Sequence, residues 1–268
     1  MDNRQGVPIT DAQQAFIDQE LRHRREVRIL RWATLVLFLA IWELGARLGW
    51  INDFIFSSPC RVFICFRDMV MDKSIFVHMG ITIAETLISF ALVIVLGVAA
   101  AVLLWSSRRI SEVLEPYLVM LNSLPKSALA PLLIVWMGAN TRTIIVAAIS
   151  VAVFGSIITL YQGFQQMDSD KIKLIYSLGG SRLHVLLKVL LPGSVPMIIS
   201  NMKVNIGLCL VGVIIGEFLA AKEGLGYLII YASQVFKMDM LVMSIVILCI
   251  VSTILYQGIA LLEKKMVR

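Results

Sequence analysis

Long apolar runs separated by short polar segments dominate this chain. A helix needs about 20 apolar residues to cross the hydrocarbon core of a bilayer, and runs of this length recur along the sequence. We therefore expect an all-α membrane protein with about six transmembrane helices, over residues 32–50, 81–105, 117–137, 144–160, 197–218 and 241–262. The first run follows a polar tail and lacks a small-residue cleavage site, which indicates a retained span and not a signal peptide.

The polar connections differ in character. Residues 51–78 mix charges with Pro59 and suit an external connection that has room for a surface helix, and residues 106–116 suit a short charged turn. The third span contains Pro125 and Pro131, each of which removes a backbone donor. We expect both prolines to interrupt it.

One segment, residues 168–196, is amphipathic and charged between two apolar runs; we call it the 168–196 loop. Ile172, Ile175 and Leu178 recur at helical spacing among polar residues, and Asp168 or Ser169 can cap that helix. The glycine pair at 179–180 predicts a stop, Ser181 a new N-cap, and Pro192 an end to the second helix. Such a helix–turn–helix is typical of a membrane surface.

Composition agrees with a membrane protein and leaves no room for a separate soluble enzyme domain. Apolar residues make up 59% of the chain and charged residues 16%, against about 45–50% and 25% in soluble domains. The net charge of +6 is explained by anionic lipid headgroups without a nucleic-acid partner. The cysteines at 60, 65, 209 and 249 form no CxxC pair, so we expect unpaired thiols.

The distribution of Lys and Arg predicts the orientation, because cytoplasmic loops carry the excess of basic residues. We expect both termini in the cytoplasm, with a tail over residues 1–31 and a transmembrane domain over 32–268. This places on the cytoplasmic side Arg4, Arg22, Arg24, Arg25, Arg28, Arg31, Arg108, Arg109, Lys171, Lys173, Arg182, Lys188, Lys264, Lys265 and Arg268. The smaller external set is Arg47, Arg61, Arg67, Lys73, Arg142, Lys222 and Lys237.

Charged residues inside the predicted spans are candidates for a translocation pathway, because they are costly in lipid. Lys126 and Lys203 could give the pathway a potential suited to anions; alternatively, Lys126 satisfies carbonyls freed by the prolines and Lys203 reaches the cytoplasmic interface. Glu217 is expected at the external end, near a gate, and Glu43 and Glu85 near span ends or paired.

Gly207, Gly212 and Gly216 form a small-residue face that predicts close packing within the chain or, alternatively, an interface with a second copy. His23, His78 and His184 fall on different sides of the membrane, so we expect no metal centre and no catalytic set.

Four segments in the same order resemble the permease subunits of ATP-binding cassette importers, in the nitrate, sulfonate and taurine branch. YSLGGSRLHVLLKVLLPGSVP resembles the Glu-Ala-Ala loop of that family, with Gly179 on its glycine and Leu191 and Pro192 on its Leu-Pro. The other three are FIFSSPCRVF (54–63), LNSLPKSALAPLLIVWMG (121–138) and IGEFLAAKEGLGYLI (215–229). Together they cover the chain from about residue 42 onward.

The resemblance implies a type I importer permease in the bacterial cytoplasmic membrane, whose loop docks on cytoplasmic ATP-binding subunits. ATP and Mg²⁺ would be bound by those subunits, since this chain has no GxxxxGK[ST] and no cofactor of its own. An extracytoplasmic solute-binding protein and a second permease copy are further implied partners. The implied docking residues are Asp170, Lys173, Ile175, Leu178, Gly179, Arg182, Leu191 and Pro192.

The chain departs from the family motif at one place: Lys173, Leu174 and Ile175 stand where the family has Glu-Ala-Ala. An ATPase surface that pairs with that Glu must therefore differ here, or the contact is minor.

The expected cargo is a small anion of the sulfonate, taurine or nitrate type, and the alternative is a vitamin precursor such as a pyrimidine or flavin. An ion-coupled secondary transporter would need paired broken helices with midplane acids, and a non-transporting scaffold would leave the loop unexplained.

Overall fold

The computed structural model describes residues 11–50 and 52–266, and the described chain is helical along most of its length. It divides into two compact units, one up to residue 63 and one from residue 64 onward. Five of the described helices are long and apolar enough to cross a membrane, and a bent pair brings the number to six. If the bent pair is counted as one span, the described chain has six candidate spans, which confirms the predicted count of about six.

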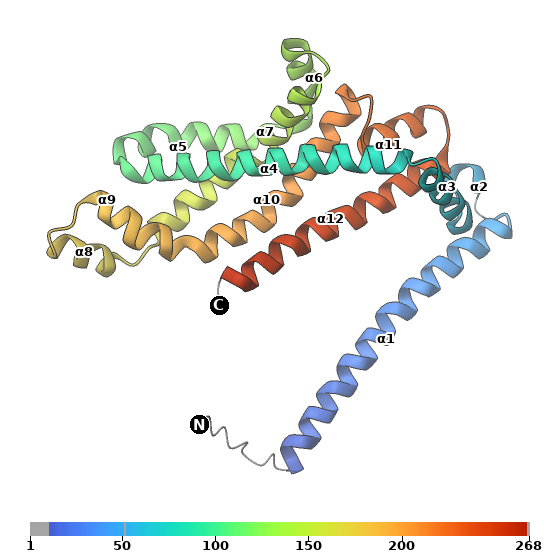
Figure 1. The fold of residues 1–268 in the computed structure, drawn as a ribbon, viewed down its shortest axis with the longest axis horizontal. Coiled ribbons are helices and arrows are strands. Elements are labelled where there is room, and N and C mark those ends of the chain that lie inside the picture. Colours follow the sequence, from blue (N-terminus) through green and yellow to red (C-terminus); the bar gives the residue numbers. More distant parts are fainter. Residues whose placement is uncertain (1–10, 51, 267–268) are drawn as a thin grey trace. The chain divides into compact units, whose positions relative to one another are not determined.

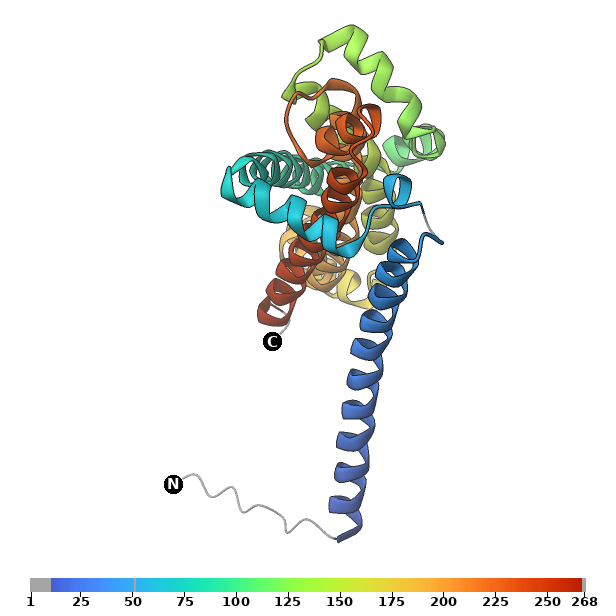
Figure 2. The same ribbon diagram turned by 90° about the vertical axis from the view of Figure 1, so that its right-hand side faces the viewer.

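In the first unit, helix α1 (Asp11–Arg47) is one unbroken helix, which Figure 2 shows in blue. The polar tail and the first span, which the sequence predicts as separate segments, are therefore joined without a turn at residue 31. No glycine or proline occurs in α1 before Gly45, so nothing in the backbone interrupts it. The short helix α2 (Asp53–Phe56) follows.

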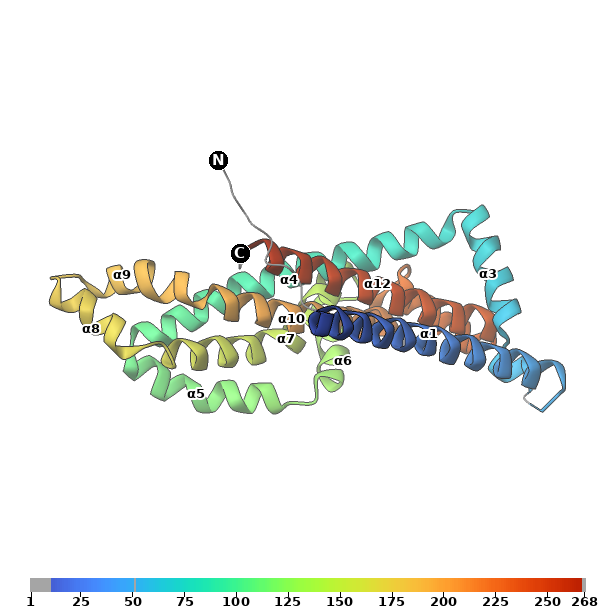
Figure 3. The same cartoon turned by 90° about the horizontal axis from the view of Figure 1, so that it is seen from below.

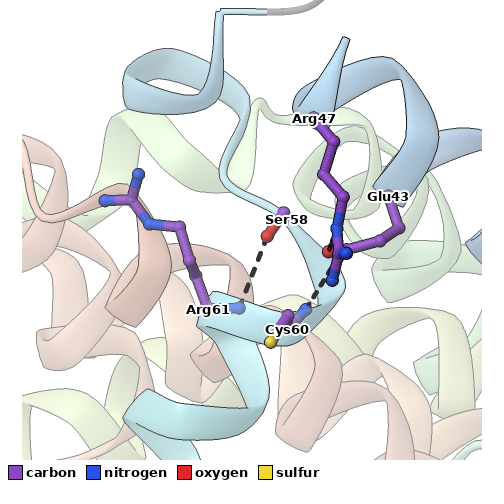
Figure 4. A network of polar contacts seen from close by, with 5 residues as sticks. All are labelled: Glu43, Arg47, Ser58, Cys60 and Arg61. Atoms are coloured by element: carbon purple, nitrogen blue, oxygen red, sulfur yellow. Dashed lines mark hydrogen bonds and ion pairs between the residues drawn. The ribbon is translucent and has the colours of Figure 1, made fainter.

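A polar network in the first unit fixes the start of α3 (Pro59–Met71), the helix for which the external connection has room. The Glu43 carboxylate accepts hydrogen bonds from Arg47 Nε at 2.7 Å and from the backbone N–H of Cys60 at 3.1 Å. The N–H of Arg61 donates to Ser58 Oγ at 3.4 Å (Figure 4). Glu43 is thus paired, which is one of the two alternatives predicted for it. Its carboxylate also accepts from a backbone N–H that the first turn of a helix leaves without a partner.

In the second unit, α4 (Ser74–Ser106), α7 (Thr141–Gln165) and α10 (Leu191–Ala220) enclose the main buried core. Helix α12 (Met238–Met266) adds Ile259 to it. Gly212 and Gly216 let α10 approach α7 closely: a Cβ there would lie 2.6 Å from Ala148 Cα and 3.0 Å from Ile144 Cα. For these two glycines, packing within the chain is confirmed.

The third span is the bent pair. Helices α5 (Arg108–Ser123) and α6 (Lys126–Met137) meet at an angle of 95°. The break lies at Leu124, whose extended backbone is the conformation that a following proline favours. Pro131 lies within α6 without ending it, so the predicted second interruption was wrong.

The prediction of a charged turn over residues 106–116 was also wrong. Helix α5 starts at Arg108, because Ser107 Oγ accepts a hydrogen bond from Ile110 N–H and Arg108 pairs with Glu112 one turn later, at 2.7 Å. Helices α5 and α7 run side by side in Figure 3, as their contacts require.

The 168–196 loop lies at one end of the second unit, and α11 (Leu225–Gln234) follows the opposite end of α10 (Figure 1). The loop contains α8 (Ser169–Ser177), α9 (Arg182–Val185) and the π-helical turn η1 (Leu186–Leu190). Contrary to expectation, its second helix does not end at Pro192 but runs on as one helical segment, Arg182–Ala220. Pro192 sits in the first turn of α10, where a missing N–H is tolerated, directly after the register change of the π turn.

Candidate functional site

The turn of the 168–196 loop requires both of its glycines. Gly179 has φ +77°, in the left-handed region that favours glycine. Its N–H donates to Tyr176 C=O at 3.0 Å and that of Gly180 to Ile175 C=O at 2.8 Å, which is the Schellman pattern of helix termination. A Cβ on Gly180 would lie 2.7 Å from that same Ile175 oxygen. The predicted stop is confirmed.

Polar side chains begin both loop helices at the predicted places. Asp168, not Ser169, caps α8, because its carboxylate accepts from Asp170 N–H at 2.9 Å. Ser181 is the N-cap residue of α9, and its own N–H donates to His184 Nδ1 at 3.1 Å. Lys173, which stands where the related motif has Glu, pairs with Asp170 at 3.1 Å on the exposed surface of α8.

Apolar side chains project from both loop helices. The exposed fractions are 57% for Leu174, 75% for Leu178, 60% for Leu183 and 55% for Leu187. Ile175 is half-buried beneath the turn, Leu191 is half-buried, and Pro192 is exposed. This arrangement leaves an apolar surface around a rigid turn, which is typical of a site that another protein covers.

Arg182 points from the loop to the end of α4. Its Nη2 donates to the carbonyl oxygen of Trp105 at 2.6 Å, and its guanidinium carbon lies 5.1 Å from the centre of the Trp105 ring. The loop is therefore attached to three membrane helices: to α7 and α10 through the chain itself, and to α4 through Arg182.

Two of the predicted pathway residues have protein partners. Lys126 Nζ donates to Leu121 C=O at 2.6 Å and lies 5.3 Å from the centre of the Phe154 ring. Lys203 on α10 forms a short ion pair with Glu263 on α12. The Lys126 contact has the form of its structural interpretation, whereas the pairing of Lys203 with Glu263 was not predicted.

Glu217, the third predicted pathway residue, is completely buried near the end of α10. Its carboxylate accepts hydrogen bonds from Thr82 Oγ1 at 2.7 Å and from Gly226 N–H at 2.6 Å. Thr82 Oγ1 in turn accepts from Leu225 N–H at 2.8 Å, and His78 Nδ1 accepts from Gly224 N–H at 3.0 Å. Three consecutive amides at the start of α11 are thus bound by α4 and α10.

We call this set, His78, Thr82, Glu217 and residues 224–226, the Glu217 cradle. Gly224 has φ +120°, and a Cβ there would collide with the Glu217 carboxylate; one on Gly226 would lie 2.8 Å from Glu217 Oε2. The Gly-Leu-Gly pattern marked this place in the sequence, but nothing there indicated His78 or Thr82 as its partners.

A buried polar cluster between α7 and α10 was not predicted from the sequence. The amide nitrogens of Asn201 and Asn205 both donate to Ser156 Oγ, at 2.7 and 3.0 Å. All three side chains are buried. The spacing of the two asparagines, one helical turn apart in an apolar run, was the available signal.

The sequence of this chain matches a known protein family. Residues 93–268 match the family described as the binding-protein-dependent transport system inner membrane component. A probable ABC transporter permease of Haemophilus influenzae is 31% identical over 87% of this chain and 95% of that protein. The taurine transport permease of Escherichia coli is 23% identical over 94% and 96%.

The fold is similar to that of solved importers. An inward-facing structure of the MetNI methionine ABC transporter matches with a TM-score of 0.66 and 15% identity, over 74% of this chain and 98% of that one. The chain therefore belongs to the inner membrane components of binding-protein-dependent transport systems, the family of ABC importer permeases.

Proposed function

We propose that this permease forms the pathway of an ATP-driven importer for a small anion of the sulfonate, taurine or nitrate type, delivered by a solute-binding protein. The observation that carries the ATP-driven part is the 168–196 loop, a rigid helix–turn–helix with exposed leucines on both sides of the Gly179 turn. The cargo class is supported by relatives that are named aliphatic sulfonate and taurine permeases.

In this proposal the loop docks on cytoplasmic ATP-binding subunits, which bind and hydrolyse ATP with Mg²⁺, while this chain supplies no catalytic group. The loop and both termini face the cytoplasm, and the Glu217 cradle faces outward. Closure of the ATPase subunits would move the loop and exchange inward-open for outward-open states. A second copy of the permease would complete the pathway, and anionic lipids would contact the basic cytoplasmic side.

The docking surface would be leucine-based. The Lys173 side chain is paired with Asp170, so a positive and a negative group are both presented where the related motif has an acid. The ATPase partner would therefore recognise the apolar surface around Leu174, Leu178 and Leu183 more than a single charge.

A vitamin precursor is the second candidate cargo. A formylaminopyrimidine permease is 26% identical over 72% of this chain and 76% of that protein, and a riboflavin permease is 27% identical over 88% of each. Uptake by the complete complex in vesicles, competed in turn by taurine, ethanesulfonate, nitrate, formylaminopyrimidine and riboflavin, distinguishes the two classes.

Purification of the C-terminally tagged permease from gently solubilised membranes tests the docking. We expect a Walker-A-containing ATPase to copurify with the wild type and to be lost with Gly179→Asp, because this change places a negative charge within the apolar docking surface. Gly49→Asp is the matched control, because Gly49 also has a positive φ, +73°, with no atom within 4 Å of its Cβ position, but lies outside the loop. If the permease is recovered alone and its solute transport is driven by an ion gradient, the result would support a secondary transporter instead.

A further inference from the structure

The 168–196 loop is joined by the chain itself to α7 before it and to α10 after it. The Arg182 side chain adds a third attachment, because it reaches the end of α4. Helices α4 and α10 both pack against α7, so all three attachments meet in the same core.

The contact with α4 is made at a place suited to a cation. Trp105 lies in the last turn of α4, where carbonyl oxygens lack the backbone donor of a further helical turn and carry the partial negative charge of the helix. Arg182 donates to that carbonyl at 2.6 Å and lies over the Trp105 ring, so two contacts fix one guanidinium group on one residue.

An open cavity adjoins the contact between Arg182 and Trp105. A cavity of about 320 Å³ lies between α4, α5 and α7, and Arg182 lines it together with Trp105, Arg108, Glu112 and Tyr161. The loop thus touches α4 at Trp105, at the edge of this cavity.

We propose that Arg182 is a positioning residue that transmits movement of the 168–196 loop to α4, so that α4 and α10 move together. This inference rests on the proposed docking of an ATPase on the loop. It assigns Arg182 to contact within the permease, whereas the family resemblance alone would group it with the residues that face the ATPase.

The test uses the complete complex in proteoliposomes. The solute is taurine, ethanesulfonate or nitrate, whichever the wild-type complex accumulates. The quantity measured is the uptake ratio, which is the amount of solute taken up divided by the amount of ATP hydrolysed. For Arg182→Ala we expect normal copurification of the ATPase but a ratio lower by about tenfold, because a charge-assisted hydrogen bond is lost. Arg182→Lys and Trp105→Leu each keep part of the contact and should give intermediate ratios. Arg108→Ala is the matched control, since Arg108 lines the same cavity but pairs with Glu112.

A distance measurement separates transmission from a general loss of stability and needs no cargo. In a background without cysteines, spin labels at Ser106 and Leu187 report the distance between α4 and the loop. Labels at Leu187 and Val204 lie on one helical segment, about 25 Å apart at 1.5 Å per residue. With ATP and vanadate, Arg182→Ala should broaden the first distribution and leave the second unchanged.

Three results would overturn the inference: an unchanged uptake ratio in Arg182→Ala, an unchanged distribution between positions 106 and 187, or loss of the ATPase from Arg182→Ala. The last would make Arg182 a docking residue. A wild-type complex that contains no ATPase would contradict the proposed function itself, which is a different result.

Discussion

The ammonium group of Lys126 lies 2.6 Å from the carbonyl oxygen of Leu121, four residues before Pro125. In an uninterrupted helix that oxygen would accept from the N–H of residue 125, which proline lacks. A side chain therefore replaces the backbone donor at the bend between α5 and α6. A charged residue within an apolar span is explained here by the proline beside it.

Replacing Lys126 tests this explanation. Lys126→Met should leave the Leu121 oxygen without a donor and lower the free energy of unfolding by about 1–3 kcal/mol, whereas Lys126→Arg should retain most of it. Thermal unfolding of the purified protein in detergent measures the change. Unchanged stability of Lys126→Met together with altered anion selectivity would indicate a pathway role instead.

The Glu217 cradle predicts an unusual intolerance to one methyl group. Gly224→Ala would place a Cβ against the Glu217 carboxylate at φ +120°, so we expect a large loss of folded protein. Gly207→Ala is the control, because a Cβ at position 207 meets no atom within 4 Å. Size-exclusion chromatography in detergent measures the folded fraction, and equal yields of the two variants would contradict the cradle.

At Gly179 the constraint is conformational and not spatial, since a Cβ there meets nothing within 4 Å. Gly179→Asn should retain more ATPase binding than Gly179→Ala, because Asn tolerates the left-handed region, and Gly179→Val should retain the least. The conformational free-energy cost of Gly179→Ala is about 1 kcal/mol. Copurification of the ATPase with the three variants gives the order. Equal binding by Asn and Val would show that the turn conformation is not needed.

The pair between Lys203 and Glu263 predicts a recoverable loss. Each of Lys203→Met and Glu263→Gln should destabilise the packing of α10 on α12, and the effects should be coupled by about 0.5–3 kcal/mol. The exchange Lys203→Glu with Glu263→Lys should restore part of the stability. A double-mutant cycle on thermal unfolding measures the coupling, and strictly additive effects would mean that the two side chains do not interact.

Much of the fold follows from local patterns in the sequence. The spans were predictable because apolar runs of sufficient length have few other solutions, and the loop turn because Gly179 and Gly180 meet a conformational and a steric demand at once. The start of α5 was not predictable in this way. Its polar composition suggests a turn, but the Ser107 cap and the Arg108–Glu112 pair stabilise a helix there.

The candidate site was predictable only where its residues are neighbours in sequence. Glu217 could be singled out as an acid near the end of a span, but His78 and Thr82 come from a helix more than 130 residues earlier and carry no local pattern. For the same reason Arg182 could be placed in the loop, while its attachment to Trp105 depends on how α4 ends against the loop.

The helical segment from Arg182 to Ala220 carries Arg182 at one end and Glu217 near the other. The Asn201–Ser156–Asn205 hydrogen bonds, the close approach of Gly212 and Gly216, and the Thr82–Glu217 hydrogen bond hold this segment to α7 and α4 along its length. A displacement of the loop would therefore reach the Glu217 cradle along one continuous helix, with no separate signal to be relayed across the bilayer.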